Sequence, residues 1–172
     1  MDSELHNLIH GMNIFFLDID PTKCAQYHLD KHVVKMIIET AQMLYSVHWV
    51  LEKDLPEGSY RKTHVNHPCS VWARQSNQNY KWLCLLGIEL CREYTYRYGK
   101  IHKTERHINW LDSNMPDLPD INFTEPAQAM PDEYKDINPI VAYRNFYVKN
   151  KMDLRGITKY TKRPIPDWVC TT

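Results

Sequence analysis

Apolar positions along the 172-residue chain recur mostly at helical spacing, with polar and proline-containing stretches between them. The first apolar run, MNIFFL at 12–17, predicts a short buried strand or extended segment. Asp20-Pro21 then supplies an N-cap and a first helical residue. Because nothing interrupts the helical pattern before about Lys53, the sequence predicts one long first helix.

Two more helical regions are predicted further along. Pro68 begins a pattern that continues to Tyr98 with a joint near Ser76-Asn77, and Gly99 is positioned as a C-terminal cap. Prolines and acids predict mostly loop at 109–136, and a last helix is expected at 139–152. The fold class is therefore mainly α, a compact single domain at 12–172 with about three to five helices. A polar extension (1–11) precedes it, and an irregular tail with two prolines ends it.

Composition limits the class of protein. Hydrophobic residues make up 43% of the chain and charged residues 24%, which excludes intrinsic disorder and collagen-like repeats. The apolar stretches are far shorter than the ~20 residues of a membrane span, and the N-terminus lacks the pattern of a secretory signal. Five cysteines with no CxxC pair predict reduced, buried thiols. We expect an intracellular protein with no membrane partner, in the host cytoplasm or nucleus if it is viral.

The overall charge balances, but its distribution is uneven. Residues 112–136 contain seven acids and one base, whereas 144–163 contain seven bases and one acid, with aromatic residues among them. A basic, aromatic segment suits nucleic acid, because cations meet phosphates and rings stack on bases. An amphipathic C-terminal helix with an ordinary solvated face is the alternative.

A stripe of ionisable and polar residues follows the first predicted helix. Its members are spaced 4, 3, 4, 3 and 4 residues apart, and they are His28, His32, Lys35, Glu39, Gln42 and Ser46. At 100° per residue they fall within roughly 80° of one another, between two apolar flanks. The stripe is therefore expected to face the interior or a cleft. Burying such groups costs several kcal/mol unless they pair, which indicates either an active site or a mutually satisfied structural network.

Further candidates lie beyond this helix. The turn before Pro68 holds His64, Asn66 and His67, which suit recognition of an anion or a leaving group or act merely as a helix cap. The candidate catalytic residues are Glu39, Lys35, His28, His32 and His67. The candidate substrate-binding residues are His64, Asn66, Trp72, Arg74, Asn79, Gln128, Tyr143 and Arg144. An aromatic pocket for a base could draw on Trp72, Tyr80, Trp82, Tyr143 and Tyr147.

Metal chemistry is the first alternative. His28 and His32 have the i, i+4 spacing of helical zinc ligands, and His64 and His67 could complete a four-nitrogen site. Lys35, one turn further on, would repel a cation, so we expect no cofactor, with zinc or another divalent metal as the lesser alternative. The absence of a glycine-rich phosphate loop and of a Gly-x-Ser-x-Gly motif disfavours ATP-driven and serine-hydrolase chemistry.

Several short motifs together resemble known proteins. They are Asp18-x-Asp20-Pro21, His28-x3-His32-x2-Lys35, Asn66-His67-Pro68, and the Tyr-x-Tyr-Arg-Tyr-Gly-Lys-Ile segment that ends at Ile101. The pattern resembles small proteins of phages and large viruses. Over residues 12–101 it is also distantly similar to the pyrimidine-dimer DNA glycosylases that include phage endonuclease V.

The resemblance implies a compact α-helical glycosylase whose N-terminal amine attacks the sugar C1′ with help from a helix glutamate. In this chain the amine would belong to Asn13 after removal of Met12, and the carboxylate would be Glu39. Lys35, with its pKa lowered by burial beside histidines, is an alternative imine-forming amine.

The expected function is that of an enzyme, with a role in DNA repair. It would cleave or modify DNA or a nucleotide-like substrate at a base or N-glycosidic bond, by acid–base or imine chemistry from the first helix. The alternatives are a metal-dependent hydrolase or nuclease and a non-catalytic viral protein that binds or sequesters a nucleotide. The sequence does not fix the oligomeric state.

Overall fold

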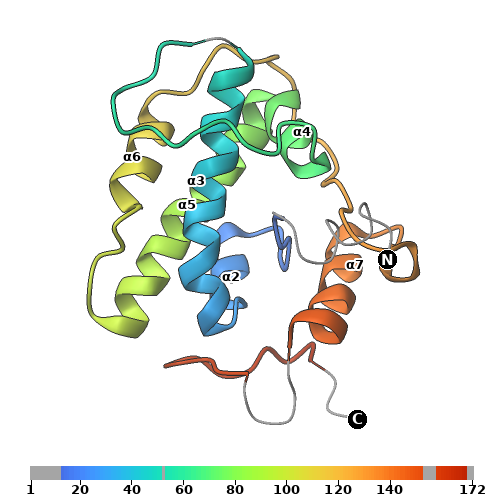
Figure 1. The fold of residues 1–172 in the computed structure, drawn as a ribbon. Helices are drawn as coiled ribbons and strands as arrows, with labels where there is room; N and C mark the ends of the chain where they lie inside the picture. The colour runs from blue at the N-terminus through green and yellow to red at the C-terminus, as the bar shows by residue number, and fades with distance from the viewer. Residues whose placement is uncertain (1–12, 52, 153–157, 170–172) are drawn as a thin grey trace.

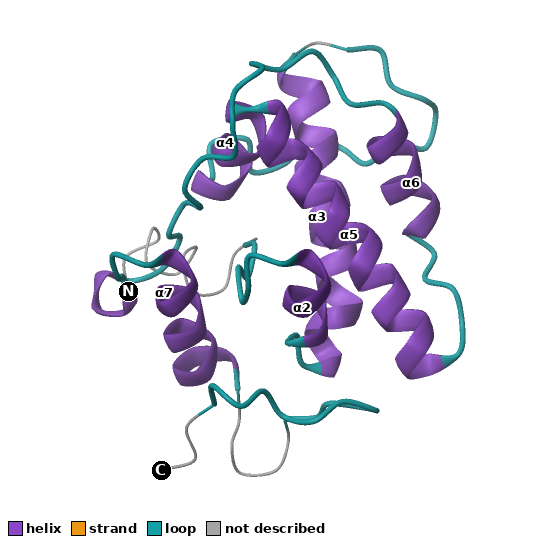
Figure 2. Ribbon diagram, turned by 180° about the vertical axis from the view of Figure 1, so that it is seen from behind, coloured by secondary structure: helices purple, strands orange, loops and turns teal. Residues whose placement is uncertain are grey.

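The computed structural model describes residues 13–51, 53–152 and 158–169. In this part of the chain all regular structure is helical, which confirms the mainly α class (Figures 1 and 2). The six α-helices are α2 (Pro21–Gln26), α3 (Asp30–Val50), α4 (Pro68–Gln75), α5 (Asn77–Tyr98), α6 (Glu105–Ser113) and α7 (Pro139–Phe146). A 3₁₀ turn η1 (Asp132–Tyr134) precedes α7, and a π-helical turn η2 (Tyr147–Lys151) continues it.

Helix α5 lies at the centre of the fold and packs against α2, α3, α4 and α6. Figure 1 shows α7 set to the side of this group, with the segment after residue 12 between α7 and α2. This segment is buried and extended, as predicted, but it pairs with no strand in the described residues. The Phe16 ring stacks on Trp82 and meets the ring of Trp72 edge-on, at centroid distances of 5.0 Å each. The same ring lies 5.2 Å from that of Tyr143 on α7, so the segment joins α7 to the main bundle through its aromatic core.

The helix ends follow local signals in the sequence. The Asp20 side chain accepts the Thr22 N–H at 2.9 Å ahead of Pro21, and the Ser76 hydroxyl accepts the Asn79 N–H at 3.0 Å. Gly99 ends α5 in the left-handed region, with φ of 70°, where a residue without a Cβ is least strained. The predicted joint near Ser76-Asn77 and the predicted glycine cap are both confirmed.

The single long helix predicted from Pro21 to about Lys53 is wrong, because the chain breaks at 27–29 between α2 and α3. A side chain from the far end of the sequence stabilises the break: the Tyr147 hydroxyl accepts the Leu29 N–H at 2.9 Å. The Asp30 N–H is bound in the same region by the Lys159 carbonyl oxygen at 2.9 Å. Donors that a continuous helix would satisfy internally are thus satisfied by tertiary contacts.

The prediction of mostly loop at 109–136 is wrong at its start, because α6 extends to Ser113. Ile108 and Leu111 are buried, and Gly87 of α5 permits the close approach of α6. A Cβ at Gly87 would lie 3.0 Å from Ile108 Cδ1 and 3.2 Å from Thr40 Cγ2. The helix predicted at 139–152 is present, with its last turn widened to the π form.

The C-terminal segment 158–169 crosses the bundle at the N-terminal end of α3 (Figure 1). The backbone N–H of Thr161 donates to Asp30 at 2.8 Å, and Arg163 donates to both carboxyl oxygens of Glu93 at 2.8 and 3.1 Å. Arg97, buried beneath the segment, binds Asp30 and Glu93 at 3.0 and 2.9 Å. Two acids therefore bind both the buried arginine and the C-terminal segment.

The four cysteines in the described residues are buried, unpaired thiols, as expected: Cys24, Cys69, Cys84 and Cys91. Cys170 and the predicted extension at 1–11 lie outside the described residues. In the part of the chain that the structure describes, no helix combines the length and the apolar character that crossing a membrane requires.

Candidate active site

The polar stripe of the first helix is partly internal. His28, His32 and Ser46 are buried, and the Glu39 side chain is 14% exposed. Lys35 departs from the prediction, since 52% of its side chain is exposed. The expected burial of Lys35 beside the histidines is therefore wrong, because its long side chain extends from the helix into solvent.

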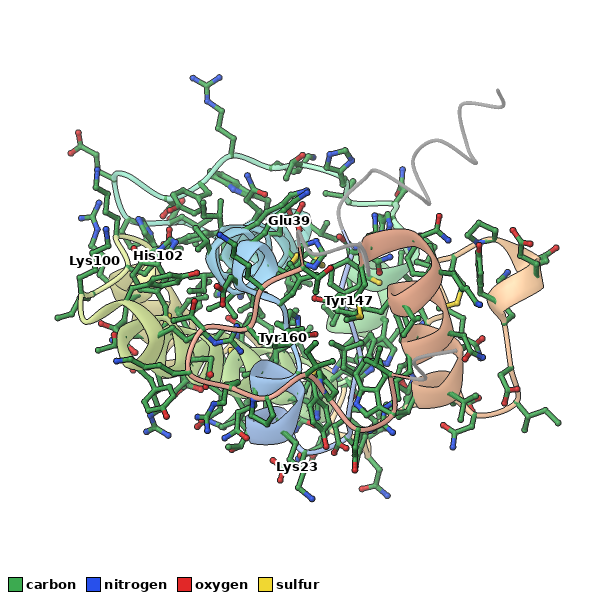
Figure 3. The ribbon with its side chains drawn as sticks, turned by 90° about the horizontal axis from the view of Figure 1, so that it is seen from below. Lys23, Glu39, Lys100, His102, Tyr147 and Tyr160 are labelled. Atoms are coloured by element: carbon green, nitrogen blue, oxygen red, sulfur yellow. The ribbon has the colours of Figure 1, made fainter. Side chains whose placement is uncertain are left out.

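Tyr147 and His32 form the best-defined contact of the stripe, with Tyr147 Oη 2.7 Å from His32 Nδ1. In Figure 3, Tyr147 lies between α3 and α7. Since the hydroxyl oxygen accepts the Leu29 N–H, its own proton is available to His32 Nδ1. This pattern assigns the His32 proton to Nε2. Burial lowers the pKa of His32 to about 2, and nearby positive charges add to the effect, so the ring is neutral at physiological pH.

His28 lies in the break between α2 and α3, and it is also neutral. Its Nδ1 is 2.6 Å from the carbonyl oxygen of Cys24, which can only accept, so Nδ1 carries the proton. The other nitrogen, Nε2, is buried with no hydrogen-bond partner in the described residues. Burial lowers the pKa of His28 to about 4. His28 and His32 therefore contribute no positive charge near pH 7.

Glu39 is the acid of the site. Burial raises its pKa to about 7, against the opposing positive charges of Lys35 and Lys151. Lys35 Nζ lies 3.9 Å from Glu39 Oε1, a long ion pair. A carboxyl whose pKa is raised in this way holds its proton closer to neutral pH than an ordinary glutamate does, which suits a general acid or base.

Lys151 is a residue of this region that the sequence did not single out. It ends η2 and is half-buried, with Nζ 5.4 Å from the ring centre of Phe146 and 5.9 Å from that of Phe15. Burial lowers its pKa, and the charge of Lys35 lowers it further while that of Glu39 raises it. The only signal in the sequence was its membership of the basic segment 144–163.

Lysines of α3 and η2 lie near enough to affect the same groups. The positive charges of Lys31, Lys35 and Lys151 each lower the pKa of His32. Those of Lys31 and Lys35 also lower the pKa of Lys151. Lys31 and Lys35 are exposed. Glu39 is therefore influenced by cations from two elements that are far apart in the sequence, Lys35 of α3 and Lys151 of η2.

The turn before α4 is a helix cap. His67 Nδ1 accepts the Cys69 N–H at 3.1 Å, and the Arg74 guanidinium donates to the Val65 carbonyl at 2.6 Å. Burial lowers the pKa of His67 to about 4. His64, with φ of 47°, and Asn66 are exposed. Among the described residues, no hydrogen bond, ion pair or ring contact joins this turn to Glu39 or the neutral histidines.

The remaining predicted binding residues make contacts within the protein. Trp72 donates to the Thr124 carbonyl, and Asn79 binds the same loop. Gln128 holds the backbone of Asp136, Tyr143 binds the backbone of Ala127 and Ala129, and Arg144 binds Leu17 and Asp18. The five rings proposed for a base pocket are all buried: Trp72, Tyr80, Trp82, Tyr143 and Tyr147. In this structure they pack the core and offer no open face to a base.

The spacing of the histidines does not produce a metal site. Among the described residues, no three His, Cys, Asp or Glu side chains are grouped so that they could hold a metal ion. The Nδ1 atoms of His28 and His32 are both engaged in hydrogen bonds within the protein. The four-histidine site suggested by the spacing is therefore not formed.

Comparison with known proteins gave no relative: no protein-family model, no curated protein and no solved structure matches this chain. The resemblance to pyrimidine-dimer glycosylases therefore stays a prediction, and the candidate site is argued from its own geometry.

Proposed function

We propose that the protein is an enzyme that acts on DNA or a nucleotide-like substrate and cleaves or modifies it at a base or N-glycosidic bond. Glu39 is the general acid. A departing base needs a proton as the C1′–N bond breaks, and a carboxyl that titrates near pH 7 can supply it. The electron pair of that bond leaves with the base while a nucleophile takes its place at C1′.

The observation that carries this proposal is the contrast between two acids that are largely shielded from solvent. Glu93 is 4% exposed, and hydrogen bonds from Arg163 and Arg97 overcome the effect of burial and lower its pKa. Glu39 is 14% exposed, but the half-exposed Lys35 lies 3.9 Å from it in a long ion pair, and its pKa is raised. The negative charge of Glu93 is balanced by two arginines and has a structural role. The environment of Glu39 instead favours the uptake and release of a proton.

The cations near Glu39 suit an anionic substrate. Lys31 and Lys35 are exposed on α3, and their charges and that of Lys151 on η2 all lower the pKa of His32. The repulsion among grouped lysines falls when a phosphate chain binds between them. Release of the counterions of the nucleic acid adds to its affinity for the protein. This supports a nucleic acid or nucleotide substrate over an uncharged one.

Base release from oligonucleotides with pyrimidine dimers, uracil or other altered bases tests the proposal. We expect Glu39→Gln to reduce the rate by about 10²–10⁴-fold, since an amide cannot give up a proton. Glu89→Gln is the matched control, because Glu89 is a 17%-exposed helical acid paired with Arg92 at 2.6 Å, and it should keep the rate.

Thermal unfolding verifies that both variants fold. Full activity in a folded Glu39→Gln protein would reject Glu39 as the acid. Tight binding of oligonucleotides or nucleotides by the wild type without any turnover would reject an enzyme and favour a binding protein.

A further inference from the structure

A pocket of about 460 Å³ lies between the end of α2 and the C-terminal segment 158–169. Its volume is within the range of about 300–1,000 Å³ that is typical of small-molecule sites. Gln26 and Tyr27 line it from the end of α2, and residues 163–167 line it from the C-terminal segment. The pocket shares no residue with the polar stripe of the first helix or with η2.

The walls of this pocket are held in place by contacts within the protein. The Tyr160 hydroxyl donates to the Tyr27 carbonyl oxygen at 2.7 Å, which joins the C-terminal segment to the end of α2. The Arg144 guanidinium lies 5.5 Å from the centre of the Tyr27 ring, and the Trp168 ring meets that ring edge-on at 5.6 Å. Two prolines in the segment fix backbone φ angles of the second wall. The pocket is therefore preformed, and a ligand that binds there has little of the protein to order.

Several polar groups of the lining are available to a ligand. In the described residues, no hydrogen bond is made by the Gln26 side-chain amide, the Tyr27 hydroxyl or the Asp167 carboxylate. Arg163 binds Glu93 through Nε and Nη2 at 2.8 and 3.1 Å, which leaves the two N–H groups of Nη1 for another acceptor. The pocket thus offers a cation and an anion from one short segment, together with an aromatic ring.

The two opposite charges limit the class of ligand. A phosphate or carboxylate would be repelled by Asp167, and an ammonium group would be repelled by Arg163. A neutral ring that has acceptors on one edge and donors on another satisfies both side chains, and a flat ring can stack on Tyr27. Guanine has this arrangement, because O6 and N7 accept hydrogen bonds while N1–H and the 2-amino group donate them. The other common bases have no two adjacent positions that both donate.

We infer that this pocket binds a guanine base, either of a free nucleoside or nucleotide or of single-stranded nucleic acid. Asp167 accepts hydrogen bonds from N1–H and the 2-amino group, and Arg163 Nη1 donates to O6 or N7. The base stacks on the Tyr27 ring. Because the pocket shares no residue with the region of Glu39, this binding does not depend on the proposed function.

Isothermal titration calorimetry with the full chain tests this binding. Guanosine should bind about tenfold or more tightly than inosine, which lacks only the 2-amino group, and than adenosine. Asp167→Asn should weaken guanosine binding by about tenfold or more and should instead favour xanthosine, because the amide N–H can donate to its 2-oxo group. A gain of xanthosine binding is a readout that a merely structural role of Asp167 would not produce.

Asp117→Asn is the matched control. Asp117 is exposed like Asp167, lies outside the pocket and has no hydrogen bond within the part of the chain that the structure describes. This variant should keep the wild-type affinity for guanosine. Thermal unfolding verifies that both variants fold.

Single-stranded oligonucleotides distinguish the two sources of the base. One strand carries a single guanine, and its counterpart carries hypoxanthine at the same position. A preference for the guanine strand that Asp167→Asn removes, without binding of free guanosine, supports the pocket as a site for nucleic acid.

Equal affinities for guanine and hypoxanthine in both forms overturn the inference, and so does a guanine preference that Asp167→Asn leaves intact. Absence of guanosine and oligonucleotide binding overturns it as well. Base release that depends on Glu39 would still support the proposed function in each of these cases, so either proposal can fail without the other.

Discussion

Glu39 and Lys35 lie one turn apart on α3, yet 3.9 Å separates Oε1 from Nζ. A hydrogen-bonded ion pair would be about 1 Å shorter. The lysine lies largely in water and the acid largely in protein, so burial outweighs attraction and the carboxyl keeps its proton to an unusually high pH.

The first prediction concerns the pH dependence of activity. If Glu39 donates the proton, base release should be fastest below about pH 7 and fall by about tenfold per pH unit above it. The profile of kcat/KM between pH 5.5 and pH 9 at fixed ionic strength measures this, because kcat/KM depends on the protonation state of the enzyme without bound substrate. A rate that stays level up to pH 9 would contradict Glu39 as the acid.

The second prediction concerns stability and follows from linkage. The native state raises the pKa of Glu39 from 4.5 to about 7, so it binds this proton more tightly than the unfolded chain does. The contribution of Glu39 to stability is therefore complete below pH 4.5 and declines as the pH rises to about 7. Relative to the wild type, Glu39→Gln should gain about 1–3 kcal/mol in unfolding free energy between pH 4.5 and pH 8.

Urea denaturation of both proteins at the two pH values gives this difference, and the contributions of other groups cancel in the comparison. Glu89, a 17%-exposed acid paired with the exposed Arg92, serves as a control, with a change of about 0–1 kcal/mol expected for Glu89→Gln. Equal effects of Glu39→Gln at both pH values would show that folding does not change the pKa of the Glu39 carboxyl.

The third prediction concerns the hydroxyl of Tyr147. Tyr147→Phe leaves the buried Leu29 N–H and His32 Nδ1 without their partner and should lower the unfolding free energy by about 1–3 kcal/mol. Tyr94→Phe is the comparison, because the Tyr94 hydroxyl has no hydrogen bond in the described residues and its ring contacts stay intact. Losses of equal size in the two variants would mean that the Tyr147 hydroxyl does not stabilise the helix break.

The fourth prediction concerns the attachment of the C-terminal segment. Glu93→Gln removes the charge that Arg97 and Arg163 share and should cost about 3–5 kcal/mol, because the buried Arg97 loses one of its two acids. Arg163→Ala should instead leave the helical bundle folded and expose residues 158–169 to protease. Limited proteolysis with mass analysis distinguishes the two outcomes. Unchanged cleavage of the Arg163→Ala protein would show that other contacts hold the segment.

The sequence predicts the features that depend on neighbouring residues. Asp20-Pro21, Ser76 and Gly99 act through bonds that span a few residues, so their positions are readable directly. The break after α2 is not readable, because the Leu29 N–H is bound by Tyr147, 118 residues away. Helical spacing alone continues across that point.

The residues of the candidate site also divide into those that the sequence predicts and those that it does not. Helical periodicity correctly predicts that the side chains of His32 and Glu39 face inward, because both lie on one face of α3. It also predicts an inward-facing Lys35, which is wrong, because a long flexible side chain can leave the face on which its Cα lies. Lys151 could not be assigned to this region, since only the fold of α7 and η2 brings it near enough to affect His32.

The ion pairs around Arg97 also affect how the protein is made. Asp30 and Glu93 are synthesised long before Thr161 and Arg163, the residues that complete their binding. While the chain is still on the ribosome, α3 and α5 can pack and enclose Arg97, but each acid then lacks part of its final environment. Synthesis of residues 158–169 thus supplies contacts that both acids need, and a chain that stops before Thr161 lacks the bonds that Thr161 and Arg163 make to them.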